Sequence, residues 1–247
     1  MNETIQLLHN HRSIRKFTTQ EITKEQIRTI VDAGQCASTS SNVMAYSIIG
    51  ITDEKIKKGL QKVSGQPYVE KNGYLFVICA DLNRNFHLGT SVEQDQIKEV
   101  IESTEQFIVS TIDAALVTQN MVIATESLGL GACFLGSLRN KINRVDELLE
   151  LPEYVIPLYG LAIGYPNHQP ETKPRLPFNA VFHENTYDSD KKQKFIQEYD
   201  QMLHSYYQER STNNKVDTWT EQMRRKYTVP TRMDVGPYVH KKKLNKH

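Results

Sequence analysis

The segment His11-Arg12-Ser13-Ile14-Arg15-Lys16-Phe17 brings an imidazole, a hydroxyl and three cations close together between two short predicted helices. Guanidinium and ammonium groups at this density can hold a phosphate group through charge-assisted hydrogen bonds. Two further segments suit the same kind of ligand, the basic Lys173-Pro174-Arg175 and the small polar loop Ser38-Thr39-Ser40-Ser41-Asn42. A single run of charge is common on solvated surfaces. Three such segments in this order predict a bound anion.

A planar ligand with a phosphate group would use all of these segments. It needs cations for the phosphate, hydroxyl and amide groups for its polar edge, and glycines where the backbone approaches a flat face. FMN is a ligand with these groups. The residues by themselves predict a phosphorylated cofactor. The candidates, in the same order, are Arg12, Arg15, Lys173 and Arg175; Thr39, Ser40 and Gln66; Gly131 and Gly136.

Other common chemistries lack their sequence signals. The chain has no GxSxG, HExxH, Walker or GxGxxG motif, which argues against the usual nucleophilic, zinc and Rossmann sites. His9 and His11 have no acidic or cysteine ligand beside them, so we expect no metal.

Composition narrows the class of protein. A chain of 247 residues can form one large domain with an appended segment. Its net charge of +1, from 30 basic and 29 acidic side chains, gives no global attraction for nucleic acid or an anionic membrane. Cys36, Cys79 and Cys133 are far apart and odd in number, which suggests small core residues in a reducing compartment. With no signal-peptide pattern or membrane span, we expect a soluble cytoplasmic protein.

Hydrophobic periodicity predicts the elements that position these residues. A capping box at Thr23–Gln26 starts a helix that ends near Gly34, and a helix capped by Asp53 separates two strands. A long helix is apolar around most of its circumference, as in a core or a subunit interface. The predicted strands cover 46–52, 74–80, 131–138 and 155–165, and the long helix covers 105–128.

The chain changes in composition after its second basic segment. Residues 183–247 are polar and poor in aliphatic side chains, with amphipathic helices predicted at 191–208 and 218–226. Such a segment cannot form a core of its own, so we expect it to wrap onto the main body or onto a partner subunit. The predicted division is a core of residues 1–182 and a C-terminal extension of residues 183–247, in an α+β fold.

Over nearly its whole length the chain resembles the oxygen-insensitive NADPH nitroreductases grouped with flavin reductase P, in the nitroreductase superfamily. The resemblance depends on several motifs in a fixed order, and the tail segments HENTY and NNKVDTW extend it. The motifs are HRSIRKF at 11–17, CASTSSN at 36–42, ESLGLGACFLGSLRN at 126–140, GLAIGYP at 160–166 and KPRLP at 173–177.

The resemblance implies a central, mostly antiparallel sheet flanked by helices, and a homodimer with two FMN molecules at the subunit interface. Two positions depart from the family pattern. Gly136-Ser137 stands where Gly-Gly is frequent, and Lys215 replaces an arginine in the loop that, with Arg210, would bind the 2′-phosphate of NADPH. The implied FMN-binding residues are His11, Arg12, Ser13, Arg15, Ser38, Thr39, Ser40, Gln66, Phe134, Leu135, Gly136, Ser137, Lys173 and Arg175.

The implied activity is two-electron transfer from NADPH to nitro compounds, quinones, free flavin or similar acceptors, in a ping-pong sequence. The chemistry would take place at N5 of tightly bound, non-covalent FMN, so no side chain is expected to be an obligatory catalyst. Two alternatives need the same pocket. One is a dedicated flavin or disulfide reductase, and the other is a flavin carrier without useful turnover.

Overall fold

The computed structural model describes residues 1–190, 192–210 and 214–247. They divide into two compact units, residues 1–170 with 232–247, and residues 171–231. The predicted boundary at residue 182 is a boundary of sequence composition and stays a prediction.

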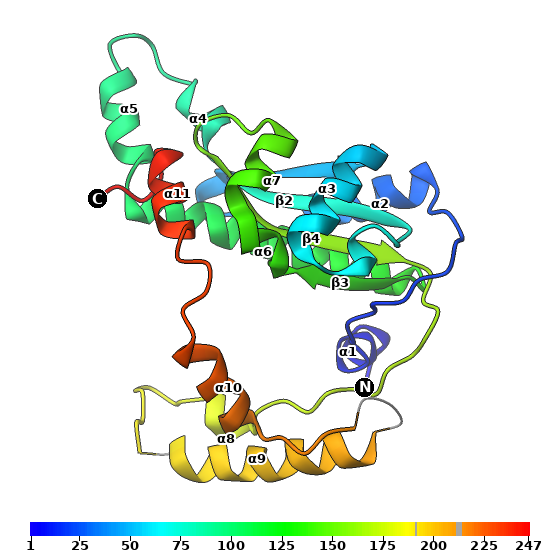
Figure 1. Ribbon diagram of the computed structural model, residues 1–247. Coiled ribbons are helices and arrows are strands. Elements are labelled where there is room, and N and C mark those ends of the chain that lie inside the picture. Colours follow the sequence, from blue (N-terminus) through cyan, green and yellow to red (C-terminus); the bar gives the residue numbers. More distant parts are fainter. Residues whose placement is uncertain (191, 211–213) are drawn as a thin grey trace. The chain divides into compact units, whose positions relative to one another are not determined.

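The first unit is built on a four-stranded antiparallel sheet in the order β1-β2-β4-β3 (Figure 1). The strands are β1 (Tyr46–Ile51), β2 (Tyr74–Asp81), β3 (Gly131–Leu135) and β4 (Val155–Gly164). Every neighbouring pair is antiparallel, with Ile51 opposite Leu75 and Gly131 opposite Gly164. The α+β fold with an antiparallel sheet is therefore confirmed.

Side chains of β2 alternate between two apolar layers because successive residues of a strand point to opposite faces. Phe76 and Ile78 pack with α2 (Lys24–Gln35) and α6 (Thr104–Ser127). On the other face, Leu75, Val77 and Cys79 pack with α3 (Glu54–Ser64) and α7 (Ile142–Leu149). The sheet thus has helices on both faces (Figure 1).

The remaining helices of this unit are α1 (Glu3–His9), α4 (Asn83–Phe86), α5 (Gln94–Ile101) and α11 (Val235–Lys241). Helix α11 completes a third apolar cluster, in which Tyr238, Val239 and Leu244 are buried. Below it, Asp146 accepts hydrogen bonds from the Tyr238 hydroxyl at 3.0 Å and from Lys242 at 2.9 Å. The C-terminal residues are therefore part of the core of the first unit.

Helix α6 has the length and apolar composition of a membrane span, and half of that stretch is buried inside the protein. Its outer face carries the exposed residues Ile108, Ile112 and Leu116 at intervals of four. Residues four apart lie on one face of a helix, so these side chains form a continuous apolar stripe. We call Ile108, Ile112 and Leu116 the α6 stripe.

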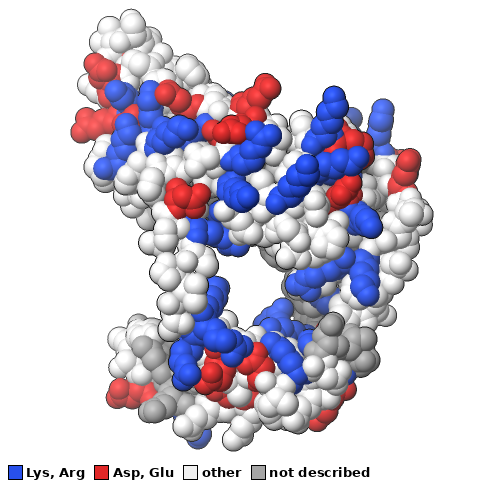
Figure 2. Space-filling model, in the orientation of Figure 1, with Lys and Arg blue, Asp and Glu red and all other residues white. Residues whose placement is uncertain are grey.

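The second unit consists of α8 (Phe178–Val181), α9 (Lys192–Glu209) and α10 (Trp219–Thr228). Its small core contains Tyr199, Leu203 and Tyr207 of α9, with Trp219 packed against them. On the face of the protein drawn in Figure 2, Lys and Arg side chains are interspersed with Asp and Glu, in keeping with the net charge of +1.

Two predictions need correction. Cys36 is exposed at the end of α2, whereas Cys79 and Cys133 are buried as expected. The strand predicted over 131–138 ends at Leu135, where a 3-10 helix (Gly136–Lys141) begins. The chain turns there, and the buried Leu138 packs into the core beside α3 and α7.

Candidate functional site

The segment 11–17 lies against the edge of the sheet and is fixed by backbone hydrogen bonds. The N–H of Ile14 donates to Ala132 at 2.9 Å, and Phe17 forms an isolated β-bridge with Pro166. Ile14 fills the space beside Gly131, where a Cβ atom would lie 2.5 Å from the Ile14 side chain. Gly131 therefore allows this segment to approach the strand, rather than a flat ligand as the sequence suggested.

His11 and Arg12 lie beside the C-terminal end of α6. The Nδ1 atom of His11 is 2.7 Å from a carboxylate oxygen of Glu126. Arg12 donates from Nε to the carbonyl of Asn10 and from Nη1 to that of Pro170, at 3.0 and 3.3 Å. Arg12 and Glu126 both line a cavity of about 730 Å³ that also includes His168. Arg12 is thus held in place at a cavity, and His11 is fixed to Glu126, which also lines it.

Arg15 reaches a different group of residues. Ser13 and Arg15 flank the buried Ile14, so the extended chain directs them away from the core. Arg15 lies next to Tyr68 and Cys133: burial raises the pKa of both groups, and the positive charge of Arg15 partly opposes this. Tyr68 closely follows Gln66, and Cys133 directly precedes Phe134. The structure therefore brings three predicted binding segments together.

The end of β3 contains both exposed and buried residues. Phe134 is 41% exposed, and its ring packs edge-on against Tyr159, whereas Leu135 is buried in the core. At Gly136 the nearest atom to an added Cβ would be a guanidinium nitrogen of Arg139 at 3.4 Å. The Ser137 hydroxyl lies 2.6 Å from that of Ser64, which ties this turn to the end of α3. The serine that departs from the family pattern thus has a structural partner.

The small polar loop is fixed by Asp113, a fully buried residue of α6. Its two carboxylate oxygens accept the N–H groups of Ser40 at 2.9 Å and Ala45 at 3.1 Å. Between these points the backbone is left-handed at Ser41, Asn42 and Met44, with φ of 46°, 59° and 51°. Such values are uncommon for residues other than glycine. Asp113 thus fixes both ends of the strained segment from Ser40 to Ala45, which directly follows Ser38 and Thr39.

Within a single chain, this loop and His11 are anchored at different points of α6. The loop is attached to α6 at Asp113 and the motif at Glu126, which are 13 residues apart. At ~1.5 Å per residue, these anchors are separated by about 20 Å along the helix axis.

In the second unit, Lys173 and Arg175 flank Pro174, whose carbonyl accepts the hydroxyl of Tyr199 at 2.9 Å. The Nη1 atom of Arg175 donates to the carbonyl of Lys173 at 2.9 Å. The Nζ atom of Lys173 lies 5.7 Å from the ring centroid of Tyr207. This basic segment is therefore attached to α9.

Arg210 and Lys215 approach the same tyrosine ring. The Arg210 Cζ and Lys215 Nζ atoms are 4.7 and 4.3 Å from the centroid of Tyr207. Ser211, Thr212 and Asn213, which belong to the predicted NADPH loop, lie outside the described residues. Both ends of that loop are nonetheless in place.

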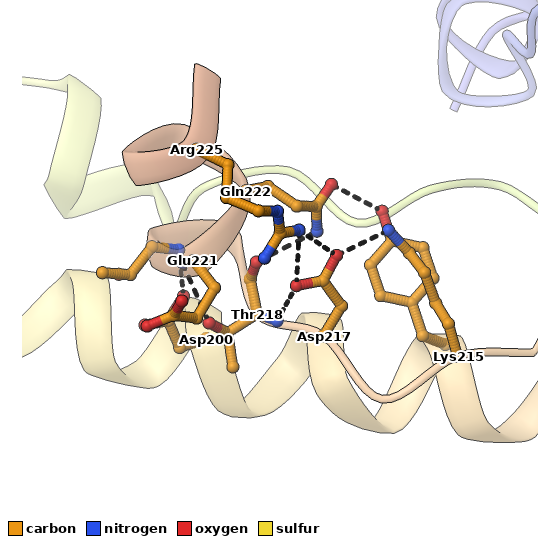
Figure 3. A network of polar contacts seen from close by, with 9 residues as sticks. Asp200, Lys215, Asp217, Thr218, Glu221, Gln222 and Arg225 are labelled. Carbon is orange, nitrogen blue, oxygen red and sulfur yellow. Dashed lines mark hydrogen bonds and ion pairs between the residues drawn. The ribbon is translucent and has the colours of Figure 1, made fainter. Parts of the chain in front are cut away.

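An acidic residue connects Lys215 to a further cation (Figure 3). Asp217 accepts from Lys215 Nζ at 2.7 Å and from Arg225 at 2.8 and 3.0 Å. The hydrogen bond from Lys215, followed by that from Arg225, outweighs burial and lowers the pKa of the Asp217 carboxyl. Burial raises the pKa of the Tyr207 phenol, but its hydrogen bonds with Lys173 and Gln222 and the nearby positive charges lower the pKa overall. Cations thus lie close to both the Tyr207 phenol and the Asp217 carboxylate.

Several residues that shape these sites were missed from the sequence. Asp113 was the one carboxylate in an otherwise apolar or small stretch, which is a usable signal for a buried acceptor. Tyr207, Asp217 and Arg225 carry no comparable signal, because their contacts depend on how α9 packs on α10.

Comparison with known proteins gives consistent matches. The family model "Nitroreductase family" matches residues 8–165, and "Nitroreductase family, C-terminal domain" matches residues 173–247. The chain is 47% identical over 250 residues to the FMN reductase (NADPH) of Bacillus subtilis, with both chains fully covered. It is 44% identical to an NADPH-dependent oxidoreductase of Staphylococcus aureus, over 96% of each chain. The solved structure of the NfrA1 nitroreductase of B. subtilis matches with a TM-score of 0.92 at 46% identity, covering 99% of this chain and 100% of that one.

Proposed function

Because the chain belongs to the nitroreductase family, we propose that it is an FMN-dependent oxidoreductase that takes electrons from NADPH. Full-length relatives at 44–47% identity are named for NADPH, and one of them for FMN. We propose nitro compounds, quinones and free flavin as acceptors, and the cytoplasm as location. The three free cysteines support a reducing compartment.

The donor set of the first unit fits FMN. Arg12, Ser13 and Arg15 offer cationic and hydroxyl groups on a segment fixed to the sheet edge. Gln66 offers an amide, and the partly exposed Phe134 offers an apolar surface at the end of β3. The observation that carries the proposal is the meeting of these segments through Arg15, Tyr68 and Cys133.

When bound, FMN supplies the centre that accepts and returns a hydride. The protein's residues bind and orient the reactants. Arg12 and Arg15 are proposed to hold the flavin phosphate together with Lys173 and Arg175, and Arg210 with Lys215 to hold the 2′-phosphate of NADPH. One pocket over the flavin would bind NADPH first and the acceptor after it. No side chain needs to move a proton, because water can supply it.

We propose that the active form is a homodimer in which each site uses residues of both chains. The apolar α6 stripe is exposed in one chain, as a subunit interface would be. The loop Ser38–Ser40 is anchored on α6 about 20 Å from the anchor of His11, at ~1.5 Å per residue. A second copy supplies that loop to the flavin when the two α6 helices pack together.

The test is anaerobic mixing of the purified yellow protein with NADPH while the flavin absorbance is recorded. We expect rapid bleaching, followed by recovery of the colour on addition of a nitro compound or a quinone. A flavin spectrum that persists with NADPH contradicts the proposal and indicates a carrier. Recovery with free flavin or a disulfide alone would indicate a dedicated reductase of that acceptor.

A further inference from the structure

Three cations from separate parts of the second unit surround the ring of Tyr207. Lys215 lies 4.3 Å, Arg210 4.7 Å and Lys173 5.7 Å from the ring centroid. The tyrosine itself is only 4% exposed, in the last turns of α9. A cation within about 6 Å of an aromatic ring is attracted to it. One ring therefore determines where three positive charges sit.

Tyr207 is held by several contacts and in turn holds the cations. Its hydroxyl donates to Gln222 of α10 at 3.2 Å, and its ring packs with Tyr199 and Leu203. Its carbonyl accepts the backbone N–H of Lys215 at 3.3 Å. Lys215 is thus attached to Tyr207 through both its backbone and its side chain. This residue is fixed before any ligand arrives.

The described contacts around the ring bring four cations together with the carboxylate of Asp217. Lys173, Arg210 and Lys215 contact the ring, and Arg225 joins Lys215 through Asp217 (Figure 3). Asp217 is the carboxylate shared by Lys215 and Arg225. A dianion bound among these cations would be attracted to each of them.

We propose that Tyr207 is the positioning residue of a phosphate-monoester site formed by Lys173, Arg210 and Lys215. This rests on the proposed function and deepens it, because both substrates of that function carry such a phosphate. Lys173 was assigned to the 5′-phosphate of FMN, and Arg210 and Lys215 to the 2′-phosphate of NADPH. These two predicted groups meet on one ring, so the ring sets the geometry of phosphate recognition.

Two substitutions of Tyr207 separate the contribution of its ring from that of its hydroxyl. Tyr207→Leu removes the ring, whereas Tyr207→Phe keeps the ring and loses the hydroxyl's hydrogen bonds with Gln222 and Lys173. Leu203→Ala is the matched control, because Leu203 is fully buried in the same helix and cluster. Flavin-loaded protein is titrated calorimetrically with NADP⁺, with NAD⁺ and with adenosine 2′,5′-bisphosphate. FMN release is followed by fluorescence after dilution.

We expect Tyr207→Leu to weaken one or both phosphate interactions by about tenfold, the loss of one charge-assisted contact. Weaker NADP⁺ and adenosine bisphosphate binding with unchanged NAD⁺ binding assigns the site to the donor. Increased FMN release assigns it to the flavin phosphate. Tyr207→Phe should keep NADP⁺ binding within about threefold of the wild type, because the attraction of Arg210 and Lys215 needs only the ring.

The inference is overturned if Tyr207→Leu binds all three nucleotides and retains FMN like the wild type. It is also overturned if Leu203→Ala produces the same losses, which would make the effect one of packing. Failure of the proposed function looks different: the wild type would bind adenosine 2′,5′-bisphosphate in a Tyr207-dependent way, yet NADPH would not bleach its flavin.

Discussion

Arg15 lies where three segments of the first unit meet, next to Tyr68 and Cys133. Replacing it with alanine removes one arm of the proposed phosphate grip. A charge-assisted hydrogen bond contributes ~1.5–3 kcal/mol, so we expect FMN to bind roughly ten- to a hundredfold more weakly in a protein that still folds. The ratio of flavin to protein absorbance after dialysis measures this. Lys16→Ala, the neighbouring exposed cation, is the control and should keep its flavin; full occupancy in Arg15→Ala would place the phosphate elsewhere.

Arg210 is the second residue with a specific expectation. If it binds the 2′-phosphate, Arg210→Ala raises the KM for NADPH by about tenfold, equivalent to ~1.4 kcal/mol, and leaves the KM for NADH nearly unchanged. Lys215→Arg restores a guanidinium and should shift selectivity toward NADPH. Arg224→Ala removes an equal charge from the exposed side of α10 and is the control. Equal effects on NADPH and NADH would remove Arg210 from nucleotide recognition.

At the scale of the element, α6 carries both an interface and a loop anchor. Asp113→Ala leaves the N–H groups of Ser40 and Ala45 without their acceptor. An unsatisfied buried donor costs ~1–3 kcal/mol, so we expect a loss of at least ~2 kcal/mol of unfolding free energy, together with weaker FMN binding. Urea denaturation measures the first effect. Ser110→Ala, which removes one buried hydroxyl from the same helix, should cost at most ~1 kcal/mol; a loss of similar size in both variants would deny Asp113 a special role.

The sequence predicted the elements that show strong periodicity. The helix expected over 105–128 is Thr104–Ser127, and the strand expected over 74–80 is Tyr74–Asp81. Helix α11 was missed, because Gly236 and Pro237 disguise it and because its stability comes from burial of Tyr238 and Leu244. In the same way, Arg12 and Lys173 could be singled out by type, whereas the role of Tyr207 depends on contacts between elements.

For the whole molecule, the α6 stripe predicts the assembly. Ile112→Lys places a charge in the middle of the proposed interface, so we expect a monomer in sedimentation and a loss of FMN, because the second copy no longer supplies its loop. Val92→Lys changes an apolar residue on the α4–α5 connection that is even more exposed than Ile112, and it should leave the dimer intact. A monomer of Ile112→Lys that keeps its full complement of flavin would contradict the shared site.

Burial of the C-terminal residues gives a second prediction at this scale, on the stability of the first unit. Leu244 is fully buried in the cluster completed by α11. Truncating a buried leucine costs ~2–5 kcal/mol, so Leu244→Ala should lower the unfolding free energy of the first unit by that amount. Thermal unfolding with and without added FMN measures the change. An unaltered melting temperature would show that α11 contributes little to the core.

Because residues 232–247 belong to the first unit, that unit can complete its core only at the end of synthesis. The sheet is complete once β4 has emerged from the ribosome, but the third apolar cluster lacks Tyr238, Val239 and Leu244 until a further eighty or so residues have been translated. During that interval Ile101, Val109 and Tyr154 have no cover from α11. The nascent chain therefore exposes an apolar surface for several seconds at ~5–20 residues per second, and a chaperone that recognises such surfaces has its opportunity in that interval.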